Sequence, residues 1–428
     1  MSESKGLQSW WQVHQRIGKG VQVPGWSFSV KFVIEAIGVK TGGGVEVTLN
    51  LLRQLAGYRN HRIVALVPDL PPYDEVAGYT DRAIRFPPNV SLIGRHGILS
   101  RAVPRICGEE RADVLLCLGN FAPATAPCPA VVLLQNAWYL YDEPTAWHRL
   151  SLREKLIIAY GRRRLAARSG PAHVIVQTPV MKRRLAALRG GVDAGITVIP
   201  TAPPLPPPEQ KPASAGSHEP FTFLCLSRYA AHKNFEILLD AAKILRTLPR
   251  RPFRCVLTTG PDQHPGARKL LRRIEREGLQ ELIVNRGPVP RGELAGIFAE
   301  ADAHLLPTLL ETAGLTYGEA MHFGLPILTS DRDFARERCQ DAAVYFDPLD
   351  AESVAKAMAR VMDDADLRAR LVANGKRVLA TCPAWDEITA QFVEVLERVA
   401  TGKSVADRKS EAGAPFVHPG EPFRFRSY

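Results

Sequence analysis

"ETAGLTYGEAMHFGLP", residues 311–326, joins two short apolar runs, "AHLLPT" (303–308) and "PILTS" (326–330), and contains two glutamates eight positions apart. The apolar runs are typical of buried strands, and the stretch between them predicts a loop and then a helix that begins at Thr316. A strand, a helix and a second strand in this order form the unit of a parallel sheet covered by helices. Glu311 is thereby placed in a loop beside a buried strand, where a carboxylate is costly unless something binds it.

The same alternation of strand-like and helix-like segments continues on both sides of this stretch. Before residue 200 the strand-like segments are 29–38, 61–68, 112–119, 130–137, 172–178 and 196–200, and after residue 220 they are 221–229, 253–260, 282–287, 302–308, 326–330 and 342–348. This pattern predicts an α/β protein with two doubly wound, Rossmann-like domains, and a ligand in the cleft at the carboxyl ends of their strands.

Proline-rich and polar segments suggest where the domains begin and end. The expected boundaries are a flexible leader over 1–28, an N-terminal domain over 29–200, a linker over 201–220, a C-terminal domain over 221–385, a helix over 386–400 that could pack back on the N-terminal domain, and a disordered tail over 401–428.

Composition narrows the class of protein further. A chain of 428 residues with 46% hydrophobic and 23% charged residues is typical of about two globular domains. Its seven cysteines contain no C-x-x-C pair, which argues against a disulfide framework or a zinc cluster and favours a reducing cytosol. The N-terminus lacks the apolar core of a signal peptide. The uncharged stretch 114–141 contains three prolines, and it favours two buried strands over a transmembrane helix.

Positive charge is concentrated in the first half of the chain. The net charge is +11, and residues 149–189 alone contain eleven basic residues and one acid, Glu154. Such a patch suits anionic lipid, nucleic acid or a polyanionic glycan, and the alternative is a solvated face that only aids solubility. We expect Leu152, Leu156, Ala159 and Leu165 to pack inward while the neighbouring arginines stay in water. Trp10 and Trp11 could add an interfacial anchor, with a disordered leader as the alternative.

Two loops could bind an anion. Gly42, Gly43 and Gly44 lie between a strand and a helix, where backbone N–H groups can approach an anion, although a tight turn is an equally good explanation. The spacing fits neither the P-loop nor the dinucleotide-binding fingerprint. In "SRYAAHKNFE", Arg228 and Lys233 lie between a strand and a helix start and suit a diphosphate; an exposed loop pair is the alternative.

The opening stretch offers a third cluster. Thr316 and Glu319 match the T-x-x-E capping box, so Glu319 could simply hold the helix start. Glu311 has no such capping role. The N–H groups of Ala313, Gly314 and Leu315 should point to one place at the positive end of the helix, next to Glu311.

Four segments in order resemble glycosyltransferase family 4. The Glu311/Glu319 pair resembles the family's E-x7-E donor motif. "SRYAAHKNFEILLDAA" is similar to its Arg/Lys segment, "RGPVPRGELAGIFAEADAHLLPT" to the stretch before the glutamates, and "DAAVYFDPLDAESVAKAM" to the stretch after them. The resemblance covers 221–380 well and 30–200 more loosely. It implies a GT-B fold, in which two Rossmann-like domains face each other across a cleft, and a retaining transfer of a hexose or deoxyhexose from a nucleotide sugar.

The resemblance also implies roles for individual residues. Arg228 and Lys233 would hold the donor diphosphate, and Glu311 would contact the hydroxyls of the donor sugar. The remaining donor-binding residues would be Glu319 at the ribose, Ala313, Gly314, Leu315 and Thr316 at the sugar and phosphate, Gly42, Gly43 and Gly44 across the cleft, and Pro288 and Val289 at the base. No cofactor or metal is expected, and the partners would be a UDP- or GDP-linked donor and a glycan or lipid-linked acceptor. The place of action would be the cytoplasm, with peripheral attachment to an anionic membrane through 149–189.

Some features depart from the family or favour other classes. Gln135 and Asn136 stand where many members place a histidine, and "ETAG" replaces the common E-G-F-G. Asp331 and Asp333 resemble the metal-binding DxD of another glycosyltransferase fold, but they follow a strand in an expected loop. A non-catalytic nucleotide-sugar binder would be expected to lack one of the anion-stabilising residues, and all are present. A nucleic-acid-binding protein would explain the positive charge, but no binding module or interleaved aromatic residues are found.

Overall fold

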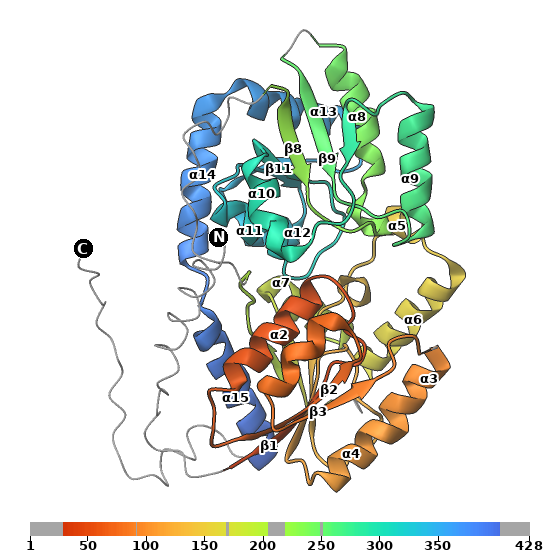
Figure 1. Ribbon diagram of the computed structural model, residues 1–428, viewed down its shortest axis with the longest axis vertical. Coiled ribbons are helices and arrows are strands. Elements are labelled where there is room, and N and C mark those ends of the chain that lie inside the picture. Colours follow the sequence, from red (N-terminus) through yellow and green to blue (C-terminus); the bar gives the residue numbers. More distant parts are fainter. Residues whose placement is uncertain (1–28, 91, 168–170, 204–218, 249–250, 403–428) are drawn as a thin grey trace, which may run out of the picture.

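The computed structural model describes residues 29–90, 92–167, 171–203, 219–248 and 251–402. The expected leader, most of the linker and all but two residues of the expected tail lie outside the described residues, as do Trp10 and Trp11. The described chain forms two α/β lobes, one above the other in Figure 1.

The N-terminal lobe is built on a seven-stranded parallel sheet with the order β3-β2-β1-β4-β5-β6-β7. Its strands are β1 (Lys31–Glu35), β2 (Arg62–Pro68), β3 (Arg82–Phe86), β4 (Val114–Cys117), β5 (Ala130–Leu134), β6 (His173–Val176) and β7 (Ile196–Val198). Its helices are α2 (Gly43–Leu55), α3 (Leu92–Gly97), α4 (Val103–Glu109), α6 (Leu152–Ala166) and α7 (Pro179–Leu188). The short helix α5 (Pro144–Trp147) belongs to the same half of the sequence but lies against the turn Ala231–Lys233 of the other lobe. The central strands are buried along their length, because helices cover both faces of the sheet.

The C-terminal lobe repeats this plan with six parallel strands in the order β10-β9-β8-β11-β12-β13. The strands are β8 (Phe221–Cys225), β9 (Phe253–Leu257), β10 (Ile283–Asn285), β11 (Ala303–Leu306), β12 (Ile327–Ser330) and β13 (Ala343–Phe346). The helices are α8 (Glu236–Arg246), α9 (Pro265–Arg276), α10 (Leu294–Ala299), α11 (Leu315–His322), α12 (Asp333–Cys339), α13 (Ala351–Asp363) and α14 (Ala365–Ala380). The prediction of two doubly wound domains is confirmed, and the strand order reverses between β1 and β4 and between β8 and β11, the points where such sheets bind ligands.

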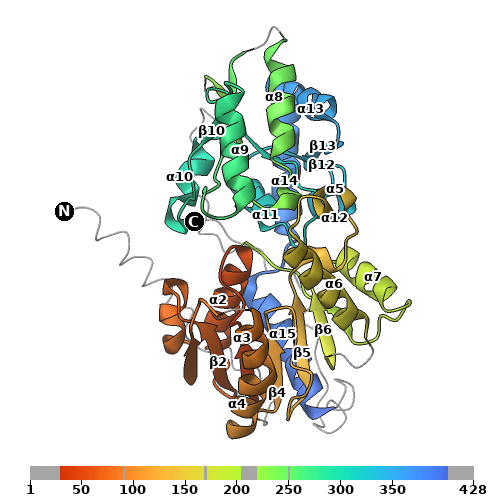
Figure 2. The same cartoon turned by 90° about the vertical axis from the view of Figure 1, so that its right-hand side faces the viewer.

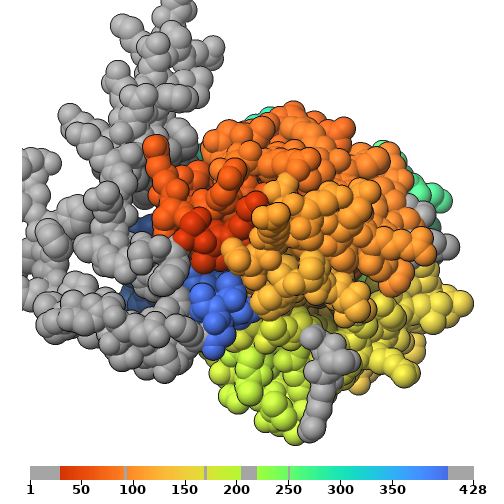
Figure 3. Space-filling view, turned by 90° about the horizontal axis from the view of Figure 1, so that it is seen from below, coloured from red at the N-terminus to blue at the C-terminus, as the bar shows by residue number. Residues whose placement is uncertain are grey.

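A last helix, α15 (Trp385–Thr401), lies against the N-terminal lobe although it follows the C-terminal one in sequence. Ile388, Phe392 and Leu396 are buried in the same core as β1 and α2. From below, α15 appears as a blue patch between the red start of the described chain and the yellow-green strands (Figure 3).

Two connecting segments between the lobes meet at one side chain. The Arg338 guanidinium of α12 donates to the carbonyl oxygen of Thr201 at 3.2 Å and lies 3.6 Å from the Cys382 sulfur. Thr201 belongs to the connection that enters the C-terminal lobe, and Cys382 belongs to the one that leaves it for α15. The two connections therefore run close together.

The orientation of helix α6 differs from the one predicted from the sequence. Leu165 is buried as expected, but Leu152, Leu156 and Ala159 face outward. The buried stripe runs through Ile158, Gly161 and Leu165 instead. A Cβ atom on Gly161 would lie 2.3 Å from the Tyr139 ring, so the glycine permits the close approach that fixes this face inward.

The uncharged stretch 114–141 forms β4 and β5, as the sequence predicts, rather than one helix. Among the described residues, no helix combines the length and the apolar character needed to cross a bilayer.

Candidate active site

Arg228 and Lys233 lie in the segment between β8 and α8, at the carboxyl end of the C-terminal sheet. Arg228 is exposed three residues after β8 ends, and Lys233 closes a short 3-10 turn, η4 (Ala231–Lys233). Asn234 adopts a left-handed conformation with φ 56°, and its side-chain amide donates to the carbonyl oxygen of Pro348 at 2.8 Å. This bond fixes the direction in which the segment leaves the turn and so orients Lys233.

Glu311 forms an ion pair with Lys233. The two side chains are only 14% and 16% exposed, and they come from the ends of the neighbouring strands β11 and β8. The Leu309 N–H donates to the carbonyl oxygen of His232 at 2.7 Å and ties the two loops together. The Thr308 hydroxyl lies 3.4 Å from Glu311 Oε1. The structure thus brings together a cation and a carboxylate that the sequence analysis placed in two separate loops.

Helix α11 begins at Leu315, one residue earlier than expected, and this excludes the capping box. Its N-cap is Gly314, whose φ of 56° is left-handed, and no side chain caps the helix start. Thr316 is therefore inside the first turn. Glu319 lies further along the helix, 7% exposed, where it cannot reach back to the N-cap. A role other than capping is needed to explain this buried carboxylate.

The surroundings of Glu319 favour its neutral form. Burial raises the pKa of its carboxyl to about 7, with Arg291 opposing the shift and Glu46 adding to it. Arg291 and Glu46 form an ion pair of 2.7 Å that joins the segment after β10 to helix α2 of the other lobe. Glu319 therefore lies beside a charged bridge between the lobes.

Ionisation of Glu319 should make stability depend on pH. Between the usual glutamate value of 4.5 and about 7, the folded protein keeps a proton that the unfolded chain has lost, so stability falls as pH rises. The variant Glu319→Gln lacks this cost, so its free energy of unfolding relative to the wild type should rise by about 2.5 kcal/mol from pH 5 to pH 8. Urea unfolding of both proteins at the two pH values measures it. Glu352→Gln, at an exposed site on α13, is the control, and a constant difference for Glu319→Gln would contradict the expectation.

The glycine turn, residues 42–44, lies in the N-terminal lobe against the start of α11 in the other lobe. Gly42 has a φ of 70°, which favours glycine, and it precedes the first turn of α2. A Cβ atom on Gly43 would lie 2.8 Å from Leu315 Cδ1, and one on Gly44 would lie 3.6 Å from Gln135 Oε1. The two lobes are therefore in close contact between this turn and the start of α11, where Gly43 leaves no room for a side chain.

Pro288 and Val289 follow β10 at the same edge of the C-terminal sheet. Pro288 is exposed, with its ring 2.9 Å from where a Cβ on Gly260 would lie, and Val289 is half-buried. They precede Arg291, whose ion pair with Glu46 joins the two lobes.

Sequence reasoning missed several polar residues that join the lobes around this cluster. The Thr312 hydroxyl donates to the carbonyl oxygen of Gln135 at 3.3 Å. The His232 ring lies edge-on to Trp138 with centroids 5.7 Å apart, and burial lowers the pKa of His232 well below its usual value. These contacts depend on how the two lobes meet, and no motif indicates that. The one available signal was the position of His232 next to Lys233.

Asp331 and Asp333 are each engaged by arginine. Asp331 accepts two bonds from Arg336, at 2.7 and 2.8 Å. Asp333 accepts from Arg184 of α7 at 2.6 Å and from the Tyr141 hydroxyl at 3.1 Å, so it joins the two lobes. In the part of the chain that the structure describes, no three His, Cys, Asp or Glu residues form a group able to hold a metal ion.

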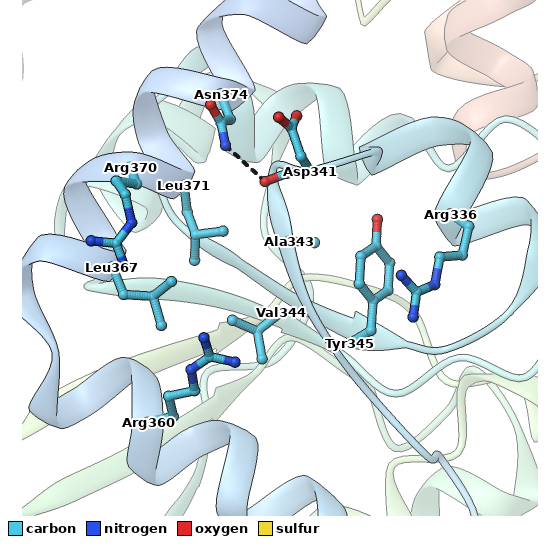
Figure 4. Close-up of a pocket in the computed structure, with 10 residues that line it drawn as sticks. All are labelled: Arg336, Asp341, Ala343, Val344, Tyr345, Arg360, Leu367, Arg370, Leu371 and Asn374. Carbon is cyan, nitrogen blue, oxygen red and sulfur yellow. Dashed lines mark hydrogen bonds between the residues drawn. The ribbon is translucent and has the colours of Figure 1, made fainter.

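A separate pocket of about 440 Å³ lies over the edge strand β13 (Figure 4). Val344, Leu367 and Leu371 form its apolar part, and Arg360 points toward them. None of the predicted donor-binding residues lines it, so it is distinct from the cluster described above.

Comparison with known proteins agrees with this arrangement. Solved structures with the same fold include sucrose-phosphate synthase from Thermosynechococcus elongatus (TM-score 0.68, 16% identity, 87% of this chain and all of that one). Another is Anabaena HepE in complex with UDP-glucose (TM-score 0.66, 18% identity, 86% of this chain and 99% of that one). Two facing parallel α/β lobes of this kind define the GT-B fold, as expected from the sequence.

The chain belongs to glycosyltransferase family 4. The model "Glycosyltransferase Family 4" matches residues 41–202, and "Glycosyl transferases group 1" matches residues 208–378. The MMP alpha-(1->4)-mannosyltransferase of Mycolicibacterium hassiacum is 27% identical over 169 residues, which are 39% of this chain and 40% of the relative. The GDP-mannose-dependent alpha-(1-6)-phosphatidylinositol monomannoside mannosyltransferase of Mycobacterium tuberculosis H37Rv is 22% identical over 387 residues, 83% of this chain and 94% of the relative. The chain spans only about 40% of the length of the first of these curated relatives.

Proposed function

We propose that this protein is a retaining glycosyltransferase that moves a hexose or deoxyhexose from a UDP- or GDP-linked donor to a glycan or lipid-linked acceptor. The product would be a polysaccharide or a glycolipid. One observation carries the proposal: the Lys233–Glu311 ion pair lies at the carboxyl ends of neighbouring strands, next to the contact between Thr312 and Gln135 of the other lobe, and Arg228 precedes Lys233 in the same loop.

Lys233 and Arg228 would stabilise the departing diphosphate. The bond between the sugar's anomeric carbon and the phosphate oxygen breaks, and the acceptor oxygen forms its bond on the same face of the sugar. The acceptor proton passes to an oxygen of the leaving phosphate, so the products are a glycoside and a nucleoside diphosphate. Negative charge grows on the diphosphate in this step, and fixed cations in a partly dry cleft are the most effective way to stabilise it.

Glu311 and Glu319 would position the donor. Glu311 would accept hydrogen bonds from the sugar hydroxyls, and its contact with Lys233 keeps it beside the diphosphate. Glu319 would bind the ribose, while the N–H groups of Ala313, Gly314, Leu315 and Thr316 would receive the sugar and phosphate at the start of α11. Gly42, Gly43 and Gly44 would close over the phosphate, and Pro288 and Val289 would border the base.

The setting supports a reducing, cytoplasmic compartment. All seven cysteines are free, and five of them are buried in the two cores.

Donor binding and transfer should persist in EDTA, because Arg228, Lys233 and the N-terminus of α11 would stabilise the charge of the diphosphate in place of a metal ion. In EDTA, UDP-glucose or GDP-mannose at 100 times its dissociation constant should stabilise the protein by about 2.7 kcal/mol in a thermal-shift assay. UMP and GMP, which lack the second phosphate, are the matched controls and should bind more weakly.

Two results would contradict the proposal. If no nucleotide sugar stabilised the protein, the proposed donor site would be refuted. Activity that is lost in EDTA and restored by Mn²⁺ would instead assign a metal to Asp331 or Asp333.

A further inference from the structure

One face of helix α6 carries an exposed apolar stripe. Leu152, Leu156 and Tyr160 are 74%, 62% and 49% exposed, and they are three of the six large hydrophobic side chains that the described residues leave open to solvent. Their spacing of four residues keeps them on one side of the helix, opposite the buried stripe. An apolar stripe that the fold leaves uncovered marks a surface for interaction.

Basic side chains surround this stripe. Arg153 and Arg163 are exposed, whereas Arg162 forms a 3.7 Å ion pair with Asp142. Arg164 reaches over to the Tyr160 hydroxyl at 3.2 Å. The single acid of the helix, Glu154, is turned to the helix start, where it accepts bonds from Ser151. The face is therefore apolar at its centre and positive at its edges.

The positive face continues across both lobes. Helices α6 and α9 lie on the same side of the molecule, at the right in Figure 1 and toward the viewer in Figure 2. Glu154 at the start of α6 lies 3.6 Å from His264 at the start of α9. Lys269 and Arg272 of α9 are exposed. The two helices thus extend one basic surface across the boundary between the lobes.

We propose that this surface, α6 together with the exposed face of α9, docks the protein on a bilayer that contains anionic lipid. Leu152, Leu156 and Tyr160 enter the interface below the headgroups, and the arginines extend their guanidiniums to the phosphates. A second protein with an acidic groove is a poorer match, because it would pair with the arginines but leave the three exposed apolar side chains at the centre of the face without an apolar partner. Docking itself does not depend on the proposed function. Only the role of the acceptor rests on it: a lipid-linked acceptor in that bilayer would reach the site from this side.

Cosedimentation of the full chain with vesicles tests the docking. The protein should bind vesicles of phosphatidylcholine with phosphatidylglycerol at low salt, bind pure phosphatidylcholine far less, and be released at high salt. The double variant Leu152→Glu/Leu156→Glu should lose roughly a hundredfold in affinity, and Arg163→Ala about fivefold. Leu349→Glu, which changes a 51% exposed leucine of the other lobe, is the control and should bind like the wild type.

Several outcomes would overturn the proposal. These are binding that is equal on both kinds of vesicle, no binding to anionic vesicles at low salt, and unchanged binding of the double variant. A wild-type dimer that becomes monomeric in the double variant, without vesicle binding, would make the stripe a contact between copies of the chain. Nucleotide-sugar binding in solution is measured separately on the same variants, so failure of docking and failure of the proposed transfer give different results.

Discussion

Replacement of Lys233 by alanine should lower the rate of sugar transfer by about two to three orders of magnitude. Loss of one prearranged group that stabilises growing negative charge typically costs this much in kcat. Affinity for the nucleoside diphosphate should fall as well, because Lys233 would contact it before and after transfer. Steady-state kinetics and calorimetry with UDP or GDP measure the two effects. Arg228→Ala should act in the same direction.

The structure suggests two controls for this experiment. Lys356→Ala, at an exposed ion pair on α13, removes the same charge elsewhere in the lobe and should leave transfer unchanged. The double variant Lys233→Ala/Glu311→Gln removes the carboxylate that the single change leaves without its cation. If the double variant regained wild-type activity, the loss in the single variant would come from the isolated Glu311 rather than from the missing cation.

The variant Glu311→Gln should affect binding of the donor sugar without weakening binding of the donor nucleotide. Hydrogen bonds to a charged group contribute about 1.5–3 kcal/mol, so transfer should fall about tenfold to more than a hundredfold. Affinity for the free nucleoside diphosphate should stay the same or rise, because Lys233 is then released from its ion pair. The measurements are kcat/KM with the nucleotide sugar and the dissociation constant of the nucleotide without sugar.

A matched substitution makes this result specific. Glu352→Gln changes an exposed glutamate of the same lobe and should have no effect on either quantity. Transfer at the wild-type rate by Glu311→Gln would refute the proposed contact with the sugar. A parallel loss of nucleotide affinity would show that Glu311 acts on the binding of the diphosphate rather than on the binding of the sugar.

The architecture could be predicted from the sequence because buried parallel strands consist of continuous runs of apolar residues. The runs around β1, β8 and β11 are of this kind, and their alternation with helices permits few other folds. Edge strand β3 (Arg82–Phe86) was missed. Its sequence "RAIRF" carries two arginines, one of which pairs with Asp69 and Asp74, so the strand does not read as apolar.

The features that sequence reasoning missed arise between segments far apart in the chain. The inward face of α6 is decided by the fit of Gly161 against Tyr139, which no periodicity shows. The burial of Glu319 and the bridge from Arg291 to Glu46 exist only when the two lobes meet. The T-x-x-E spacing at Thr316 resembled a cap because local spacing does not show where a helix begins, and Gly314 set that point.

Arg338 binds the two connections between the lobes at one place, and this limits how the halves can move. Two connections that run side by side define a single hinge axis. The lobes can therefore rotate about this axis but resist translation and twisting relative to each other. Helix α15 must travel with the N-terminal lobe in such a swing. Two ion pairs that join the lobes, Arg291 with Glu46 and Arg149 with Glu236, would then break when the lobes separate to admit substrates and form again when the lobes close around them.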